Sequence, residues 1–226
     1  MAKVAPKKQN VLVIDVGGTN LKIIDSNHAE PVKIPSGTEM TAERMIAEVM
    51  NATKDWGYSA VSIGYPGPVA NGRPLAEPHN LGPGWVSRDF DQAFGCPVKV
   101  VNDAAMQALG GYEGGRMLFL GFGTGLGSAL IVDGALAPME LAHLPYRKGM
   151  TYEDYVGLRG LERLGKARWR RHVNIVIQQL RNALVAEYVV LGGGNSKLLK
   201  ELPEGVRMGT NANAFKGGFR LWENQR

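Results

Sequence analysis

Four polar or glycine-rich segments carry the residues that could do chemistry, and each is predicted to follow the end of a strand. They are Asp15 to Asn20, Asn102-Asp103, Gly123 to Gly127 and Gly192 to Asn195. Ligands of α/β proteins contact this end of the strands, so four segments in equivalent positions argue against chance. In "VLVIDVGGTN" the two glycines allow main-chain N–H groups to approach an anion, and Asp15 could organise a metal ion or its waters. An acidic residue beside an ordinary hairpin turn is the alternative.

The other two glycine-rich segments also suit a ligand. "GTGLG" presents main-chain N–H groups and the Thr124 hydroxyl, which together could cradle an anion, although a plain hairpin turn has the same composition. "GGGN" lacks side chains where a flat or bulky ligand would approach closely, and a tight turn from strand to helix is its alternative.

Asn102 and Asp103 form the pair predicted to act in catalysis. A carboxylate directly after a buried strand can take a proton from a substrate hydroxyl as a general base, while the neighbouring amide orients that hydroxyl. Asp103 could also be the N-cap of the following helix, and the two roles do not exclude each other.

The elements that would position these residues are predicted from apolar spacing and turn residues. In the first half we expect strands at 11–16, 21–25, 32–34, 60–64 and 98–101, a helix over 41–56 and a second helix from Asp103. Thr41 is the expected N-cap of the first helix, and Gly110 and Gly111 are expected to end the second.

The second half repeats this plan. We expect strands at 117–121, 128–132 and 188–191, a hairpin turn at Asp133-Gly134, a helix through Val173 to Leu184 and a last helix over 213–222. Thr151 and Asp154 resemble a capping box before a further helix. Two similar halves of strand hairpins and alternating helices and strands predict an α/β architecture with a cleft between the halves.

Composition bounds the function classes. With 226 residues, 44% of them hydrophobic, the chain can build a core, and its one cysteine, Cys96, allows neither an intrachain disulfide nor a cysteine-based zinc site. The first nine residues lack the apolar segment of a signal peptide, and the most apolar later stretch, 117–132, is too short and glycine-rich for a membrane span. We therefore expect a cytoplasmic protein with no membrane partner.

Much of the formal net charge of +5 comes from one basic run. Its members are Arg159, Arg163, Lys166, Arg168, Arg170 and Arg171. The run is either the solvated face of a helix or a track for a polyanion such as a chain of phosphates. No nucleic-acid-binding motif accompanies it, so nucleic acid is not an expected partner.

Seven ordered segments carry a family resemblance: "VIDVGGTNLKI", "GYPGPV", "PHNLGPGW", "VNDAAMQALGG", "GFGTGLGSALIVDG", "ELAHL" and "VVLGGGNS". Together they resemble the ROK sugar kinases, and within them the branch of polyphosphate or ATP glucokinases. The resemblance covers most of the chain, from Val11 to Ser196.

The resemblance implies an actin-like (ribonuclease H-like, hexokinase-type) two-domain fold with a central cleft. We expect a disordered basic tail at 1–10, an N-terminal domain at 11–103 and a C-terminal domain at 104–226, with the terminal helix packing back on the N-terminal domain. Members of the family are commonly dimers, so a homodimer is expected.

Site roles follow from the resemblance, position by position. Asp103 would be the general base that takes the proton of the sugar's 6-hydroxyl. The sugar-binding set would be Asn80, Asn102, Asp103, Glu140 and His143. The phosphate-binding set would be Asp15, Gly17, Gly18, Thr19, Asn20, Lys22, Thr124 and Gly125. Gly192, Gly193 and Gly194 would lie beside a nucleotide if one is used, and Asp15 would hold Mg²⁺, directly or through water.

Two departures from the family pattern concern the sugar. The family's E-x-G-H has Ala142 in place of glycine, and Pro145 stands where the glucokinase branch has a second glutamate. Glu153 could take over spatially from that glutamate. The family's cysteine-rich zinc motif is missing, so no structural zinc is expected, and no helix-turn-helix precedes Val11, which argues against a repressor.

The hypothesis is therefore a kinase that transfers a phosphoryl group from polyphosphate, ATP or both to glucose with the help of Mg²⁺. A kinase for mannose, glucosamine or N-acetylmannosamine and a catalytically weak sugar-binding relative are the alternatives.

Overall fold

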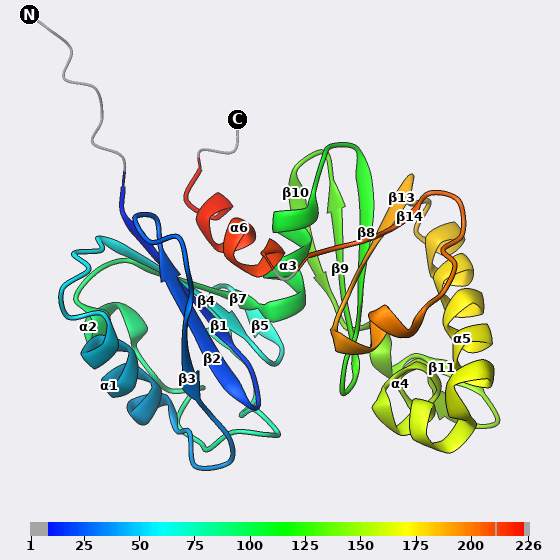
Figure 1. Cartoon of the computed structure of the whole chain (residues 1–226), viewed down its shortest axis with the longest axis horizontal. Coiled ribbons are helices and arrows are strands. Elements are labelled where there is room, and N and C mark those ends of the chain that lie inside the picture. The colour runs from blue at the N-terminus through cyan, green and yellow to red at the C-terminus, as the bar shows by residue number, and fades with distance from the viewer. Residues whose placement is uncertain (1–8, 211, 224–226) are drawn as a thin grey trace, which may run out of the picture. The chain divides into compact units, whose positions relative to one another are not determined.

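The structure, a computed structural model, describes residues 9–210 and 212–223. Most of the tail predicted at 1–10 lies outside these residues. The chain divides into two compact units between Val101 and Asn102 (Figure 1).

The first unit is built on a five-stranded sheet in the order β3-β2-β1-β4-β7. Its elements are β1 (Val11–Val16), β2 (Asn20–Asp25), β3 (Val32–Pro35), α1 (Ala42–Ala52), β4 (Ala60–Tyr65), β5 (Val69–Ala70), β6 (Arg73–Pro74), α2 (Phe90–Phe94) and β7 (Val98–Asn102). The strands β1, β2 and β3 are antiparallel neighbours, while β4 pairs with β1 in parallel.

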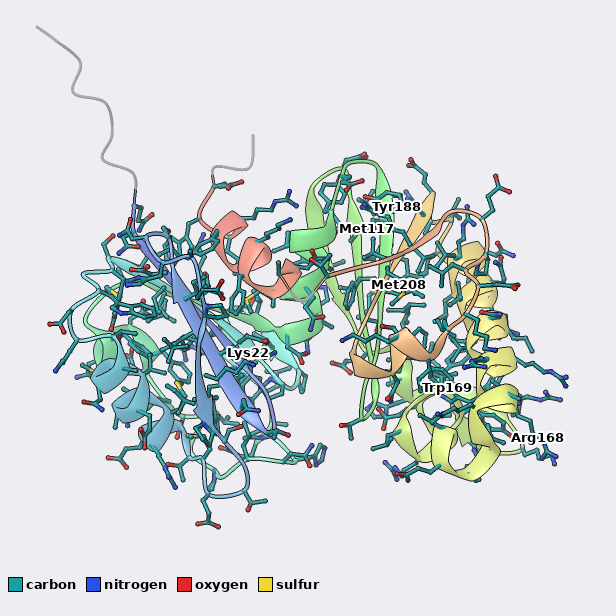
Figure 2. All side chains as sticks on the ribbon, in the orientation of Figure 1. Lys22, Met117, Arg168, Trp169, Tyr188 and Met208 are labelled. Atoms are coloured by element: carbon teal, nitrogen blue, oxygen red, sulfur yellow. The ribbon has the colours of Figure 1, made fainter. Side chains whose placement is uncertain are left out.

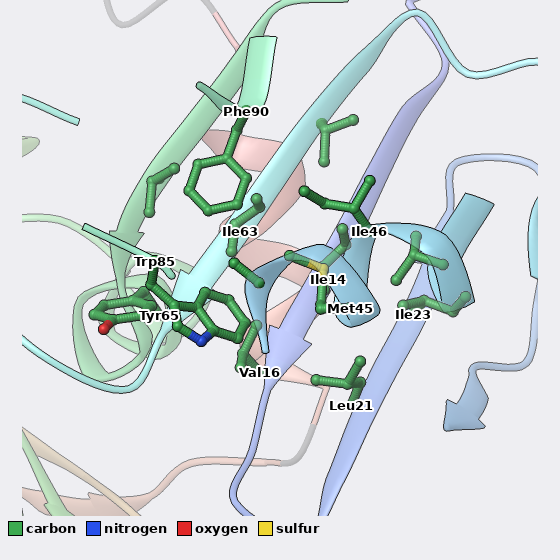
Figure 3. Packing of buried hydrophobic residues seen from close by; sticks show 14 of the residues in the cluster. Ile14, Val16, Leu21, Ile23, Met45, Ile46, Ile63, Tyr65, Trp85 and Phe90 are labelled. Carbon is green, nitrogen blue, oxygen red and sulfur yellow. The ribbon is translucent and has the colours of Figure 1, made fainter. Parts of the chain in front are cut away.

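The core of this unit follows from the alternation of side chains along the strands (Figure 3). Ile14 of β1 and Ile63 of β4 lie on the sheet face against which Met45 of α1 packs, and all three are fully buried. Thr41 is the N-cap of α1, as predicted, because its side chain accepts a hydrogen bond from the Arg44 N–H. The helix ends at Ala52 rather than at residue 56.

A buried carboxylate, Asp25, is the last residue of β2 and lies at the open end of the β1–β2 hairpin, away from its turn. It accepts hydrogen bonds from Asn10 Nδ2 at 2.8 Å, from the N–H groups of Asn27 and His28, and contacts His28 Nδ1 at 2.6 Å. The His28 ring stacks on Trp56 with 4.2 Å between centroids. Burial acts to raise the pKa of Asp25, but the hydrogen bonds outweigh it and hold the pKa below its ordinary value.

The second unit repeats the topology, with the sheet order β10-β9-β8-β13-β14. Its elements are α3 (Asp103–Gly111), β8 (Arg116–Phe122), β9 (Leu126–Val132), β10 (Ala135–Met139), η1 (Leu141–His143), β11 (Pro145–Arg147), β12 (Met150–Thr151), α4 (Tyr152–Val156), α5 (Leu158–Ala183), β13 (Tyr188–Gly192), η2 (Gly194–Leu198), β14 (Val206–Met208) and α6 (Asn213–Arg220). Again three antiparallel strands are followed by parallel ones, since β8 pairs in parallel with β13 and β13 with β14.

Helices cover both faces of this second sheet. One face packs on α5 through Trp169 and Val173, and the other packs on α3 through Ala105 and Ala108. The helix α6 in turn packs on α3. The amphipathic spacing predicted for residues 173–184 is confirmed, but α5 begins much earlier and is broken at Gly165, whose φ of 72° is not helical.

The turn residues behave largely as predicted. Asp133 and Gly134 both have positive φ, 50° and 86°, which suits the two-residue hairpin turn between β9 and β10. Thr151 and Asp154 form the predicted capping box at the start of α4. Gly110 and Gly111 are the last two residues of α3, so the helix ends where they were expected to end it, and Gly110 also lies where α6 packs too closely for a side chain.

Candidate functional site

In the first unit, Asp15 and Lys22 form a cross-strand pair. They are register partners on β1 and β2, and Lys22 Nζ lies 3.1 Å from Asp15 Oδ2. The Asp15 side chain is only 15% exposed, whereas that of Lys22 is 41% exposed, so the ammonium group is the member that can reach an incoming anion (Figure 2). The pair therefore offers a carboxylate and a cation at the end of one hairpin.

Two hydrogen bonds hold the turn between these strands, one within the turn and one from Ser36. Gly17 N donates to Asn20 O at 3.2 Å, and Ser36 Oγ donates to Gly17 O at 2.6 Å. A Cβ on Gly17 would overlap the Asn20 carbonyl, while one on Gly18 would lie 3.3 Å from Asn80 Cβ. The structure thus places the predicted phosphate turn beside Asn80, a predicted sugar residue of the same unit.

In the second unit, Asn102 and Asp103 begin α3. The N-cap is Asn102, whose Oδ1 accepts from Ala104 N and Ala105 N at 2.9 and 3.2 Å. Asp103 is therefore the first residue of the helix and not its cap, contrary to the alternative considered from the sequence. A Cβ on Gly127 would lie 2.9 Å from Ala104 Cβ, so the start of α3 packs on β9 close to the glycine-rich loop.

That loop, residues 123–125, joins β8 to β9 and is held from several sides. Gly123 N donates to Gly125 O at 3.1 Å, and Asn195 Nδ2 donates to Gly123 O at 2.9 Å. Thr124 is exposed, while its carbonyl accepts from Leu158 N at 3.0 Å. The predicted anion loop and the "GGGN" turn are therefore neighbours.

Packing explains two of the three glycines in "GGGN". A Cβ on Gly192 would overlap the Phe119 ring, and one on Gly193, at a φ of 78°, would overlap the Phe122 main chain. At Gly194 a Cβ would have nothing within 4 Å. Only Gly194 is thus not required by its neighbours to be glycine.

Glu140 and His143 flank the short η1 helix after β10. The segment is anchored by the buried Ser128, whose hydroxyl donates to Met139 O at 2.8 Å and accepts from Leu141 N at 3.3 Å. Burial raises the pKa of the Glu140 carboxyl; the charge of His143 opposes this shift, and the charge of Glu153 adds to it.

Glu153 is an acidic residue that the structure adds to the neighbourhood of the glycine-rich loop. It is the second residue of α4, and its Oε2 accepts from Leu126 N at 3.3 Å, directly after the glycine-rich loop. The sequence raised Glu153 only as a possible substitute at the sugar. Its place beside the loop comes from the β11–β12 hairpin and the Thr151 cap, which spacing alone does not locate.

The predicted basic run divides into two groups. Arg163 Nη2 donates to Asp154 O at 2.7 Å, Arg170 Nε donates to Leu198 O at 2.6 Å, and Arg159 lies 3.7 Å from Glu153. The other three members are Lys166, Arg168 and Arg171, and they are exposed. In Figure 2 the labelled Arg168 side chain points away from the ribbon of α5.

A magnesium ion fits the donor set at Asp15. Mg²⁺ in phosphoryl-transfer sites is held by one or two carboxylates, with waters and substrate phosphates supplying the other ligands. Asp15 offers one carboxylate beside an exposed glycine turn. Over residues 9–210 and 212–223, three or more His, Cys, Asp or Glu side chains nowhere gather in a way that could hold a metal by themselves. Nor does any helix in the described part of the chain have the length and apolarity to span a membrane.

Comparison with known proteins identifies the family. Residues 11–138, more than half of the chain, match the ROK family. The chain belongs to the ROK family. This match includes Asp15, the Asn102-Asp103 pair and the glycine-rich loop.

Relatives and solved structures agree with this placement. The chain is 29% identical over 208 residues to the polyphosphate glucokinase of Mycobacterium leprae. The aligned region covers 81% of this chain but only 63% of that protein. It is 28% identical to the polyphosphate glucokinase of Mycobacterium tuberculosis strain CDC 1551, over 81% of this chain and 77% of that one. The crystal structure of the inorganic polyphosphate/ATP-glucomannokinase from Arthrobacter sp. strain KM superimposes with a TM-score of 0.79, at 24% identity, over 95% of this ROK chain and 98% of that chain.

The predicted fold class is confirmed. The two repeated sheets and the likeness to this structure give the ROK chain the actin-like, hexokinase-type α/β fold.

Proposed function

We propose that the chain is a kinase that transfers a phosphoryl group from polyphosphate, ATP or both to the 6-hydroxyl of glucose. Family membership and the names of the two mycobacterial relatives support this proposal. The observation that carries it is the start of α3, where Asp103 follows β7 directly and the next residue packs on Gly127, two residues beyond the anion loop. A base and a phosphate-binding loop in the same unit are what phosphoryl transfer to an alcohol needs.

In the proposed reaction Asp103 accepts the proton of the sugar hydroxyl as its oxygen attacks the terminal phosphorus. A bond forms between this oxygen and phosphorus, and the bond from that phosphorus to the bridging oxygen of the donor breaks. Proximity and charge neutralisation supply most of the acceleration. The hydroxyl of the exposed Thr124 would donate a hydrogen bond to the donor phosphates, and the Lys22 ammonium would offset their charge.

Asp15 would hold the Mg²⁺, directly or through water, with the donor phosphates. The ion supplies positive charge that offsets the charge of the transferring phosphoryl group. Lys22, now paired with Asp15 at 3.1 Å, would turn toward the donor phosphates. The glycines of the 17–18 turn leave the main chain open to the same anion.

Asn80, Asn102, Glu140 and His143 would bind the sugar hydroxyls. Because Pro145 replaces a family glutamate, a kinase for another hexose or an amino sugar and a sugar-binding protein of weak turnover are the alternatives. A matrix of sugars against donors separates the three. Calorimetric binding of a hexose without product from any donor would favour the third.

The exposed cations of α5 favour polyphosphate as the donor, because a long polyanion gains from several positive charges. Neutralising Arg168 and Arg171 together to Gln should raise the KM for long polyphosphate more than the KM for ATP. The paired change of Lys54 and Lys216 to Gln, at exposed positions outside α5, is the control. Equal effects on the two donors would argue against this track.

Asp103→Asn and Asp103→Ala test the base. Loss of a general base slows turnover by about 10² to 10⁴-fold, and the KM values for sugar and donor should change far less. Asp55→Ala, at an exposed aspartate of the first unit, is the matched control. Full turnover by either Asp103 variant would overturn the assignment.

The proposed assembly and location are a homodimer in the cytoplasm. The single cysteine supports a reducing compartment, and light scattering of the purified protein tests the dimer.

A further inference from the structure

Ser128 is a buried hydroxyl in an apolar layer of the second unit. It is 2% exposed and lies on β9 between Leu126 and Leu130, which point to the same face of the strand and pack in the core against α5. Its register partner on β8, Leu120, belongs to the same core. A hydroxyl in such a layer costs free energy unless it is hydrogen-bonded. Packing alone would therefore be served better by alanine.

The Ser128 hydroxyl bonds to the two peptide groups on either side of Glu140. Its Oγ donates to Met139 O at 2.8 Å and accepts from Leu141 N at 3.3 Å. The first group belongs to the peptide bond that precedes Glu140, and the second belongs to the peptide bond that follows it. The φ and ψ of a residue are the relative orientation of these two peptide planes. One buried oxygen therefore holds both backbone angles of Glu140.

The conformation of Glu140 fits this bridge. Its φ of −111° and ψ of 61° lie near the inverse γ-turn, whose angles are about −75° and +65° and in which the preceding carbonyl bonds directly to the following N–H. At Glu140 the Ser128 hydroxyl stands between these two groups and bonds to each. Glu140 is the N-cap of η1, but its side chain makes no capping hydrogen bond there. Its carboxyl is accordingly not used to begin this helix.

We propose that Ser128 is a positioning residue that directs the Glu140 carboxylate toward a hexose. The inference rests on the proposed kinase function, in which Glu140 binds a sugar hydroxyl. Ser128 is too deeply buried to touch a ligand, so it acts through the backbone of Glu140. Without the hydroxyl the Leu141 N–H loses its acceptor and the Met139 carbonyl loses this donor. The two peptide planes around Glu140 can then rotate, which should weaken hexose binding and leave donor binding unchanged.

Ser128→Ala tests this separation of sugar from donor. Loss of one hydrogen bond corresponds to about a fivefold change in an equilibrium constant, so the Kd for glucose should rise by that factor or more. The Kd values for magnesium tripolyphosphate and MgATP should stay within about twofold of the parent, which is less than one hydrogen bond corresponds to. Unchanged glucose binding would overturn the proposal. An equal rise in the Kd of the donors would overturn it too, since the change would then act on the whole unit.

Thr53 offers a matched control in the first unit. It is also a hydroxyl that is 2% exposed, and it donates to Val49 O at 2.8 Å. Thr53→Val removes this hydroxyl at nearly constant volume, so it should lower Tm as Ser128→Ala does and leave the Kd for glucose unchanged. Equally weakened glucose binding in Thr53→Val would overturn the proposal, because loss of stability alone would then explain the effect.

Glu140→Ala tests whether Ser128 acts through Glu140. In the Glu140→Ala background, Ser128→Ala should have little further effect on the Kd for glucose, because the group that Ser128 directs is gone. Additive losses in the double variant would overturn the proposal, since the hydroxyl would then support another part of the site or the fold in general.

Amide hydrogen exchange at Leu141 reads the contact without sugar or turnover. Exchange should be faster in Ser128→Ala than in the parent, because this N–H has lost its acceptor, and Thr53→Val should exchange as the parent does. Unchanged exchange in Ser128→Ala would show that the hydroxyl does not hold this peptide group, and the proposal would fail.

The titration of Glu140 reads the direction of its carboxyl. Burial raises the pKa of this group, the charge of His143 opposes the shift and the charge of Glu153 adds to it. A carboxyl that turns toward water in Ser128→Ala should titrate closer to its ordinary value of 4.5, as carbon NMR at Glu140 would show. An unchanged titration would contradict the proposal.

These readings distinguish failure of the inference from failure of the proposed function. If the parent forms no product from any sugar and donor, but Leu141 exchange and the Glu140 titration change as expected, the kinase assignment fails and the hold of Ser128 on Glu140 stands. If product forms and neither reading changes in Ser128→Ala, the positioning role fails and the kinase assignment stands.

Discussion

Gly217 lies where α6 packs on α3, the helix that begins with Asp103. A Cβ there would overlap the Met106 carbonyl oxygen and lie 3.0 Å from Gly110 N. Neither atom can rotate away, because both belong to the helix main chain. Gly217→Ala therefore has to push α6 as a whole away from α3.

The cost can be worked from the contacts. Overpacking a close contact costs about 1–3 kcal/mol, and moving α6 also strains Arg220, whose Nη1 donates to the carbonyls of Leu109 at 2.5 Å and Tyr112 at 2.9 Å. Loss of one such hydrogen bond destabilises the fold by about 1 kcal/mol more. Alanine is in turn about 1 kcal/mol more favourable than glycine inside a helix, which offsets part of the destabilisation. The net loss is about 2 kcal/mol, which for a chain of this length lowers Tm by roughly 4–8 °C.

Thermal unfolding followed by circular dichroism measures this shift. Lys216→Ala, at the exposed neighbouring position of α6, is the control and should unfold within about 1 °C of the parent, as surface changes usually do. A Tm of Gly217→Ala that equals the parent's would refute the reasoning, because the helices would then have room for a methyl group. An equal fall in Lys216→Ala would show that the loss does not come from the contact.

Three further predictions concern pH and capping. The pKa of Asp25 is lowered on folding, so its contribution to stability is present above its ordinary value of 3.8 and is lost as pH falls through the folded value. In acid unfolding, the free energy of unfolding of Asp25→Asn should therefore fall less steeply with pH than that of the parent, whereas Asp55→Asn should behave as the parent does. Thr151→Ala removes the side chain of the capping box and should lower the free energy of unfolding by about 1 kcal/mol in urea. The raised pKa of Glu140 means that glucose affinity should fall on acidification at a higher pH than its ordinary 4.5 implies, and Glu153→Gln should move that fall to lower pH, as calorimetry over a pH series would show.

Sequence patterns located the elements that alternate regularly between apolar and polar residues. The strands at residues 11–16 and 60–64 and the N-cap at Thr41 were predictable because burial and capping act locally. The three-residue strand β14 and the β11–β12 hairpin were not, because their pairing partners are distant or their runs are too short to show a period.

The positions of the candidate site residues were predictable where these residues follow strands directly. Asp15 and the Asn102-Asp103 pair lie at strand ends, as expected, but which of Asn102 and Asp103 caps the helix depends on local side-chain geometry. The position of Glu153 depends on how a hairpin and a short helix fold back on the loop. Such a contact spans 27 positions, and no local pattern encodes it.

Glycine-rich motifs show why a sequence predicts where a loop lies in the fold better than it predicts the role of each residue in that loop. A glycine next to a ligand and a glycine under a neighbouring side chain look the same in a sequence, since both lack a Cβ. In this fold Gly192 and Gly193 make room for Phe119 and Phe122, and Gly125 makes room for Glu153. The packing that sets the loops and the chemistry proposed for them thus share residues, and a glycine substitution tests the chemistry only where, as at Gly194, a methyl group would meet no neighbour.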